Sequence, residues 1–475
     1  LAFGMLQVVG AYFGATTQLF GTPVYPVTGL LIQVVGGSFS LPVFVILIYY
    51  AGELVHREQG AGIKEIIDAT PYPNYIMVLS KIGALWFVLS AMLLIVLITS
   101  ILVQISLDYY NFEILLYLQG LFGVLGTGYF LLCIPAVMLQ TFSPNKFFGM
   151  VLLLVFLITL ATLPSLDFEH LLYLYSIPNV PYSAMNGWGH YVLPLVSFTA
   201  YCLALGVLMI VAAHLFYQRG VGADLQSRLA VARGRFTAAT ATVAALGLVS
   251  AIALGSWIFY NTNVLNVYLT EDAREERQAD YEKAYKQFEK LSLPQVIDLD
   301  MTVDLFPEER RLESTGSVLL VNRHDEAIAE LHLSVRPELT INEIALEGGS
   351  LSESDDHLGY YKYRFDTPFE PGAQTTLSWD LSWLNDGFPN SGATTRVVGN
   401  GTFVNNSEIM PLPGYSRSAE LNDNSVRRRY GLDPIERYPK LGDPEYLGVN
   451  QFQVAERTAF RTTIGTSADQ IAVAP

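Results

Sequence analysis

The chain has 475 residues, of which 51% are apolar and 15% are charged, and its formal net charge is −16. Residues 1–260 hold only 8 Lys/Arg and 9 Asp/Glu, whereas residues 261–475 hold 20 and 35. Soluble domains average about one charged residue in four, so the first part is not one, and the acidic second part argues against a nucleic-acid partner, which would need clustered Lys and Arg.

Long apolar stretches in the first part predict membrane-spanning helices, because about 20 apolar residues cross the hydrocarbon core. Six stretches meet or approach that length, and a seventh resembles the end of a truncated first span: 30–51, 81–104, 115–139, 146–164, 191–217, 237–260 and 1–17. We therefore expect an all-α membrane bundle with seven crossings. Cys133 and Cys202 lie inside these stretches and are expected to be passive buried or lipid-facing thiols.

The basic residues of the first part predict its orientation. All eight Lys and Arg fall in alternate connecting segments, while segments 18–29, 105–114 and 165–190 contain none. Positive loops stay in the cytoplasm, so residues 261–475 are expected to be extracytoplasmic. Four of the arginines lie in 218–236, which we interpret as a cytoplasmic basic loop that meets anionic lipid.

A helical stalk is predicted at 261–294. Tyr281, Tyr285 and Phe288 form an apolar stripe at helical spacing, and Glu282 and Lys286 are spaced for an i, i+4 ion pair. We expect a solvated helix that leans on the following domain. The alternative is a lever that transmits motion of the membrane part.

From residue 295 onward the apolar residues alternate, which predicts an antiparallel β domain over 295–475. His332 falls in mid-strand and is expected on the sheet surface. Residues 385–450 are rich in Gly, Pro, Asn and Asp and are expected to form long ordered loops. A last pair of strands is expected between Arg457 and Val473, and no closing element follows it, so we interpret the domain as incomplete.

The most informative segment is the elbow, residues 52–81, between two predicted spans on the basic side. Ile63, Ile66 and Ile67 recur at helical spacing, and Pro71 and Pro73 end the helix because proline lacks the N–H donor. The product is a short amphipathic helix at the membrane face. Such a helix can lie on lipid headgroups or dock in a groove of a soluble partner, and periodicity alone favours the headgroups.

The residues of the elbow resemble the type-2 ABC exporter permease family. The resemblance rests on Arg57-Glu58-Gln59-Gly60, Ile66-Ile67, Ala69-Thr70-Pro71 and Lys81. In that family the stretch is the coupling helix that seats in the nucleotide-binding subunit. The resemblance implies an ATPase-binding surface formed by Glu53, Arg57, Glu58, Gly60, Ile63, Ile66, Ile67, Thr70 and Pro71.

The resemblance covers 1–217, an exporter-type domain of six spans whose first span is truncated. It implies a second cytoplasmic turn at 143–146 and a helical extracytoplasmic insert at 165–190 that gates the export path, although aromatic residues there are typical of interfacial anchors. It also implies a separate, dimeric ABC ATPase subunit that carries ATP and Mg²⁺, and a second permease half. The seventh transmembrane helix, 237–260, and the β domain depart from the family plan.

The second part is similar to bacterial permeases fused to a gluzincin zinc aminopeptidase of the alanyl-aminopeptidase type. The similarity rests on 261–268, 300–308 and 365–372. It implies that 295–475 is the peptidase's N-terminal β domain, with a zinc-binding catalytic domain beyond this chain. None of the seven His begins H-E-x-x-H, and the chain has no G-x-x-x-x-G-K, so we assign no catalytic residue, metal ligand or cofactor site to it.

Three functions remain open. The first is the permease part of an ABC exporter in the bacterial inner membrane, with residues 261–475 in the periplasm. The second is a membrane-anchored extracytoplasmic aminopeptidase, and the third is a cargo-binding or sensing module on a membrane scaffold. Few polar side chains lie in the predicted spans, which favours a lipid or peptide cargo over a small ion.

Overall fold

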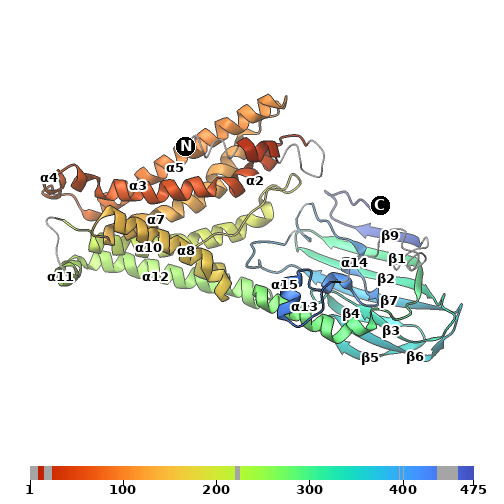
Figure 1. Ribbon diagram of the computed structural model, residues 1–475. Coiled ribbons are helices and arrows are strands. Elements are labelled where there is room, and N and C mark those ends of the chain that lie inside the picture. The colour runs from red at the N-terminus through yellow and green to blue at the C-terminus, as the bar shows by residue number, and fades with distance from the viewer. Residues whose placement is uncertain are drawn as a thin grey trace. The chain divides into compact units, whose positions relative to one another are not determined.

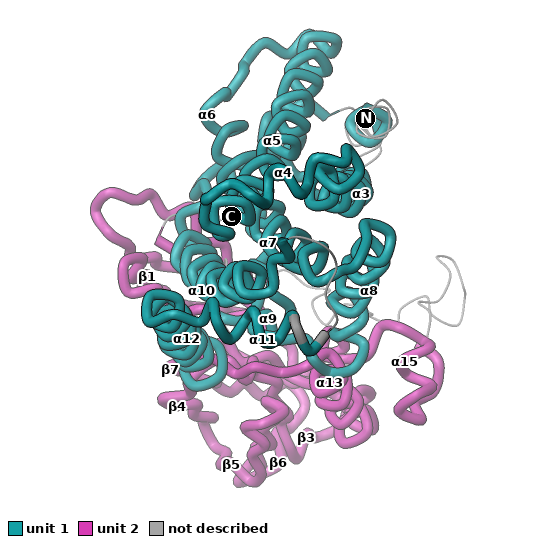
Figure 2. The backbone as a smooth tube through the Cα atoms, turned by 90° about the vertical axis from the view of Figure 1, so that its left-hand side faces the viewer, with its two compact units in different colours: residues 1–265, 389–393 teal, residues 266–388, 394–475 magenta. Residues whose placement is uncertain are grey.

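The computed structural model of the chain divides into two compact units. Unit 1 comprises residues 1–265 with 389–393, and unit 2 comprises 266–388 with 394–475 (Figure 2). The structure describes residues 9–14, 24–219, 225–394, 396–399, 401–435 and 458–474.

Unit 1 is helical (Figure 1). Five of its helical segments are long and apolar enough to cross a membrane: Asn74–Ser106, Ile114–Phe142, Lys146–Leu166, Gly189–Phe216 and Ala238–Val264. The pair α2 (Thr28–Ser38) and α3 (Ser40–Gly60) adds a sixth if a helix bent by 51° counts as one span. The predicted 30–51 span is therefore broken. Most of the predicted 1–17 span lies outside the described residues. The part that is described, residues 9–14, is helical.

The remaining helical elements of unit 1 connect or extend these segments. Helix α5 is Asn74–Ser106, and the next segment combines α6 (Ile114–Tyr117), the π-helix η2 (Leu118–Leu125) and α7 (Gly126–Phe142). The others are α4 (Lys64–Asp68), α8 (Lys146–Thr162), η3 (Leu163–Leu166), α9 (Leu171–Leu174), η4 (Gly189–Tyr191), α10 (Val192–Phe216), α11 (Leu225–Arg235), α12 (Ala238–Phe259) and η5 (Tyr260–Val264).

Two expectations for the connecting segments are wrong. The predicted basic loop 218–236 contains helix α11, because its Ala, Leu and Arg residues favour helix. The insert at 165–190 holds little helix among its described residues. Its helical content is α9, a single turn, with the ends of η3 and η4, because its prolines and glycines interrupt the hydrogen-bond ladder.

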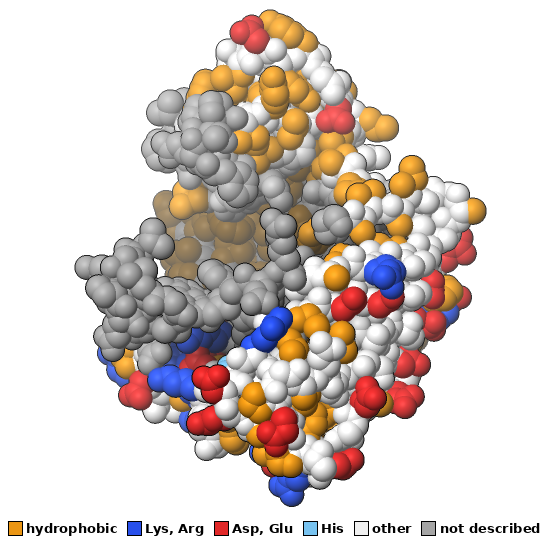
Figure 3. Space-filling model, turned by 90° about the vertical axis from the view of Figure 1, so that its right-hand side faces the viewer, with side chains coloured by type: hydrophobic (Ala, Val, Ile, Leu, Met, Phe, Trp, Pro, Cys, Tyr) orange, Lys and Arg blue, Asp and Glu red, His pale blue; other side chains and the backbone are white. Residues whose placement is uncertain are grey.

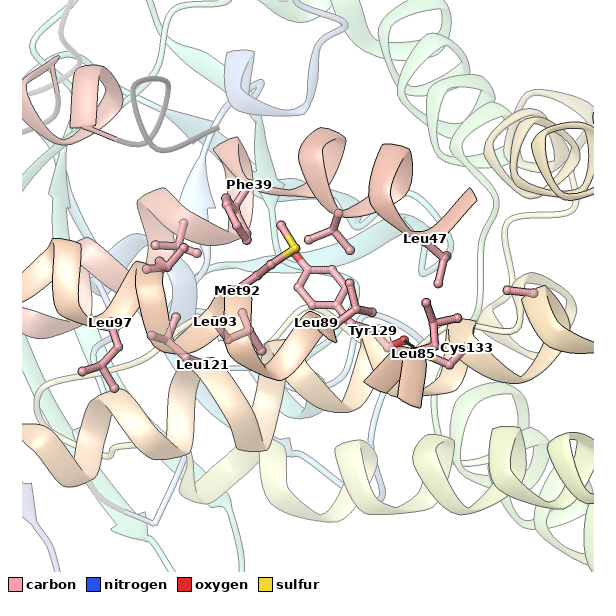
Figure 4. Close-up of a cluster of buried hydrophobic side chains, with 14 of the residues drawn as sticks. Phe39, Leu47, Leu85, Leu89, Met92, Leu93, Leu97, Leu121, Tyr129 and Cys133 are labelled. Atoms are coloured by element: carbon pink, nitrogen blue, oxygen red, sulfur yellow. Dashed lines mark hydrogen bonds between the residues drawn. The ribbon is translucent and has the colours of Figure 1, made fainter. Parts of the chain in front are cut away.

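The core of unit 1 lies where α3, α5, η2 and α7 meet. Figure 4 shows their apolar side chains pointing toward one another, with Met92 of α5 beside the Tyr129 ring of α7. Cys133 and Cys202 are buried free thiols, as predicted. The outer helices are much less buried than this core. In the segment Lys146–Leu166, which contains α8, only 11% of the most apolar stretch is buried. An exposed apolar helix surface of this kind is stable against lipid tails but unfavourable in water.

Unit 2 contains two β-sheets and a covering helix. One sheet has the strand order β4-β7-β2-β1-β9 and the other β5-β6-β3-β8. The strands are β1 (Gln295–Phe306), β2 (Arg311–Val321), β3 (Ile328–Ser334), β4 (Thr340–Leu346), β5 (Gly349–Asp355), β6 (Tyr360–Phe369), β7 (Gln374–Leu384), β8 (Leu412–Pro413) and β9 (Ala459–Gly465). All pairings are antiparallel except that of β1 with β9.

Alternating burial along β7 matches the predicted period of two, and its inward residues join one core with side chains of both sheets. The predicted final pair of strands is wrong in the described residues. Only one strand, β9, forms there, and residues 466–474 form none. The predicted loops of 385–450 contain short elements in their described part: α14 (Asn406–Ile409), β8, η7 (Arg417–Ala419) and α15 (Asn424–Arg429).

The stalk helix α13 (Glu271–Tyr285), with η6 (Lys286–Phe288), belongs to unit 2. Its aromatic stripe packs against Tyr360 and Tyr415. The expected Glu282–Lys286 pair does not form, because Glu282 binds Arg427 and Lys286 binds Glu420 and Glu289. His332 is also not a surface residue: α13 and η6 cover its sheet face, its ring lies 4.7 Å from that of Phe288, and it is 2% exposed.

The surfaces follow the composition. In Figure 3, one region of the surface carries mostly hydrophobic side chains, and another carries many Asp, Glu, Lys and Arg side chains. The exposed large hydrophobic residues are concentrated in unit 1, for example on α5 and α8.

Candidate docking site at the elbow

The elbow folds as a helix end, a turn and one isolated helical turn. Helix α3 ends at Gly60, and Gly62 has φ +68°, a conformation that glycine adopts without strain. Helix α4 follows, and the Thr70 hydroxyl donates to the Ile67 carbonyl at 2.5 Å. The two prolines then separate α4 from α5. The predicted short helix is therefore present, over Lys64–Asp68.

An ion pair closes the base of the elbow. Lys81 Nζ lies 2.8 Å from Glu58 Oε1 and donates to the Leu54 carbonyl at 2.6 Å. The Lys81 side chain is only 7% exposed, so the pair is screened less than a surface pair. Two residues of the family-like pattern, 23 positions apart, thus join the end of α3 to the start of α5.

A second ion pair joins α3 to α8. Lys146 Nζ lies 2.6 Å from Glu53 Oε1, and both side chains are 36% exposed. Asn145 caps α8 by accepting the Phe148 amide at 2.9 Å. Solvent screens an exposed pair of this kind, so it adds little to stability and acts mainly as a link between the two helices. The predicted cytoplasmic turn at 143–146 therefore contacts the elbow directly.

Arginines of the segment 218–236 bind carbonyl groups around the elbow, which the sequence reading missed. Arg219 donates to the Thr70 and Tyr72 carbonyls, and its guanidinium lies 4.6 Å from the centre of the Tyr72 ring. Arg228 donates to the Phe142 carbonyl at 3.1 Å, at the end of α7. Arg219 and Arg228 therefore bind protein carbonyls, whereas the arginines of 218–236 were expected to meet anionic lipid. No local signal in the sequence marks these contacts, because the partners are 86 to 149 residues away from the arginines.

A cavity of about 480 Å³ lies under the elbow. Ile67 and Asp68 of the elbow line it together with Gln140, Tyr217 and Arg228, so α4 and α11 lie at the same end of unit 1 (Figure 1). His56 lines it as well and was not predicted. The cavity gives the elbow an inner face as well as an outer one.

The predicted apolar face is divided between these two sides. Ile67 is half-buried toward the cavity, whereas Ile66 is 71% exposed and Ile63 43% exposed. Glu53 and Glu58 are held in ion pairs. The other predicted docking residues are exposed on the outer side: Arg57, Gly60, Thr70 and Pro71.

The elbow forms a binding surface, and its described residues form no metal site. Among the residues that the structure describes, no group of three or more His, Cys, Asp and Glu is placed to hold a metal ion. The elbow combines two outward isoleucines, one outward arginine and a rim that is fixed by ion pairs. That arrangement suits contact with a protein partner.

Comparisons with known proteins add little. No family model matches the sequence, and no curated protein matches it. Part of the chain is weakly similar to an M1 zinc metallopeptidase from Deinococcus radiodurans, with 14% identity, a TM-score of 0.17, and coverage of 20% of this chain and 21% of that chain. A two-domain M1 zinc metallopeptidase variant bound to L-tryptophan gives the same identity and score, with 22% of that chain covered. The chain thus spans about a fifth of these structures, and the score does not establish a shared fold.

Proposed function

We propose that unit 1 is the permease part of an ABC exporter and that the elbow docks a separate ATPase subunit. The observation that supports this most is the construction of the elbow. Ile63 and Ile66 face outward on a turn whose base is fixed by the Glu58–Lys81 ion pair. A scattered exposed isoleucine is ordinary, but two on a braced turn are suited to a partner groove.

The ion pairs also supply a path for motion. Glu58 links the elbow to α5 through Lys81, and Glu53 links α3 to α8 through Lys146. A displacement of the elbow would therefore move three helices together. ATP and Mg²⁺ would be bound by the dimeric partner, and a second permease half would complete the path.

The proposed placement is the bacterial inner membrane. The basic residues of the elbow and of 218–236 favour the cytoplasm, and the acidic unit 2 would then be periplasmic. For unit 2 we propose a peptidase-like β domain, on the sequence segments quoted above. Reading the gene beyond Pro475 tests this, because absence of H-E-x-x-H there would remove the peptidase alternative.

Co-purification tests the docking proposal. The full chain would be co-expressed with the ABC ATPase encoded in the neighbouring reading frame. Ile66→Asp is expected to lower the recovered ATPase at least about tenfold, because a charge placed in an apolar groove is not solvated. Arg57→Glu is expected to do the same, because it reverses the charge that the elbow presents to its partner. Ile471→Asp is the matched control, since Ile471 is 91% exposed and lies far along the chain. Recovery at the wild-type level with both elbow variants would overturn the proposal, as would absence of such a reading frame.

A further inference from the structure

Three departures from regular α-helix meet at one cavity of unit 1, of about 450 Å³. The first is the 51° bend between α2 and α3, the second is the π-helix η2, and the third is the largely non-helical segment 179–188. The cavity is separate from the one under the elbow, because the two share no lining residue.

The bend and η2 fall within predicted spans, where such departures are costly, whereas 179–188 belongs to the predicted extracytoplasmic insert. Backbone N–H and C=O groups find no water in lipid, so irregular backbone persists there only where protein covers it or where it lines a cavity. π-helical turns occur often at functional sites, and interrupted helices form binding sites in transporters. The convergence of all three departures on one cavity therefore points to a ligand.

Glycine creates the space. Gly29, Gly36 and Gly37 lie on the cavity side of α2, and Gly120 faces them from η2. A Cβ on Gly120 would lie 2.8 Å from Ile32, and one on Gly29 would lie 2.7 Å from the Tyr182 ring. Side chains at these positions would push the walls apart or fill the cavity.

The walls are mainly apolar and aromatic, and Gln33 and Asn179 add two amide side chains. Tyr182 and Trp188 from the segment 179–188 pack edge to face, with ring centres 5.2 Å apart. Val124 and Leu125 of η2 lie among the other lining residues, and none of the lining residues is charged. The volume falls within the roughly 300–1,000 Å³ that is usual for small-molecule sites.

One buried polar atom of a lining residue lacks a partner in the described part of the chain. Trp188 Nε1 is buried and has no hydrogen-bond partner among the described residues. An indole N–H only donates, so its partner must carry an acceptor oxygen. Leaving it unpaired is unfavourable, and a bound acceptor would remove that cost.

We propose that this cavity binds an uncharged amphiphile with an apolar body and an acceptor oxygen that pairs with Trp188 Nε1. The proposal deepens the exporter function by naming the class of molecule that enters unit 1, and it rests on that function only for its route of entry. Binding itself requires no ATPase.

Binding of N-octyl dansylamide to the full chain in nanodiscs tests the proposal. The neutral probe carries an octyl body and sulfonyl acceptor oxygens, and empty nanodiscs give the background from partition into lipid. Saturable dansyl emission is expected for the wild type. Gly36→Phe is expected to weaken it at least tenfold, because a Cβ there already contacts Leu125 at 3.5 Å and the ring would occupy the cavity.

Trp188→Phe keeps the ring and removes the donor, so it is expected to weaken binding about fivefold, as for one ordinary hydrogen bond. Gly123→Phe is the matched control in η2, since Gly123 does not line the cavity, a Cβ there meets no atom within 4 Å, and binding should not change. No saturable binding by the wild type, or wild-type affinity in both Gly36→Phe and Trp188→Phe, would overturn the proposal. ATPase co-purification with Gly36→Phe reports separately on the exporter function, because the elbow is unaltered.

Discussion

Arg427 of α15 forms a forked ion pair with Glu282 of α13, 145 residues earlier in the chain. The Arg427 Nη1 group donates to Glu282 Oε2 at 2.7 Å, and Nη2 donates to the other carboxylate oxygen. Both side chains are almost fully buried, at 3% and 4% exposure. The pair holds the stalk helix and the C-terminal segment of unit 2 together.

Arg427→Met is therefore expected to destabilise unit 2 by about 3–5 kcal/mol, because it leaves the Glu282 carboxylate buried without its partner. Urea unfolding of the full chain, followed by tryptophan fluorescence, measures the loss. The control is Arg429→Met in the same helix, which breaks the solvent-exposed ion pairs of Arg429 with Asp272 and Glu275 and should therefore cost far less. The double variant with Glu282→Met should recover part of the loss. Equal effects of the two single variants would contradict this.

Two glycines of unit 2 separate backbone strain from a steric clash. Gly359 and Gly348 have nearly the same φ, +70° and +71°. A Cβ on Gly359 would lie 2.0 Å from the Val335 carbonyl oxygen, whereas one on Gly348 meets nothing within 4 Å. Gly348→Ala is expected to cost about 1–2 kcal/mol, and Gly359→Ala clearly more, because backbone must move as well. Thermal unfolding of the two variants measures which is less stable. A Tm for Gly359→Ala equal to or higher than that of Gly348→Ala would contradict the prediction.

Lys81 is expected to order the elbow. Lys81→Met leaves Glu58 without its partner and removes the hydrogen bond to the Leu54 carbonyl, so local opening should become easier by about 2 kcal/mol. Hydrogen exchange of residues 54–64 should then rise by roughly tenfold or more. Lys64→Met is the control, because Lys64 has no ion pair among the residues that the structure describes. Unchanged exchange in Lys81→Met would show that the ion pair does not brace the elbow.

His332 makes unit 2 sensitive to acid. Burial, and then the nearby Lys362, lower the pKa of His332 below its ordinary value of 6.5, while Glu330 and Glu353 act in the opposite direction. Its Nδ1 lies 2.9 Å from the Tyr360 hydroxyl. Above about pH 6.5 His332 is neutral in both states. Below that pH the unfolded chain takes up a proton that the folded chain resists, so stability falls as the pH falls.

His332→Gln is expected to remove this part of the pH dependence, so that the variant loses less stability than the wild type between pH 7 and pH 5. Unfolding free energies of the wild type and the variant at the two pH values provide the measurement. Carboxylates elsewhere contribute equally to both chains and cancel in the difference. An identical loss of stability in both proteins would show that His332 does not contribute.

The apolar spans were predictable because both lipid and a protein core require apolar side chains, whichever neighbours a helix finally meets. The alternation along β7 and the proline stop after α4 were predictable for a similar reason, since each is a property of local backbone geometry. The bend at Ser38–Ser40 was not predicted, because the apolar residues of 30–51 outweighed the Gly36-Gly37-Ser38 stretch that interrupts the helix there. Helix α11 in 218–236 was also not predicted, because the four arginines of that segment were interpreted as a loop that contacts lipid.

The sequence by itself determined which segments are apolar, which are charged and where the elbow helix stops. Tertiary structure alone decided the partners. Glu282 was spaced to pair with Lys286 but binds Arg427, and Glu58 finds Lys81. Ion pairs between distant residues depend on how helices rotate and where strands place the connecting loops, and local spacing carries no record of either. The cavity beside Trp188 depends in the same way on glycines from separate helices meeting, so only the folded chain shows it.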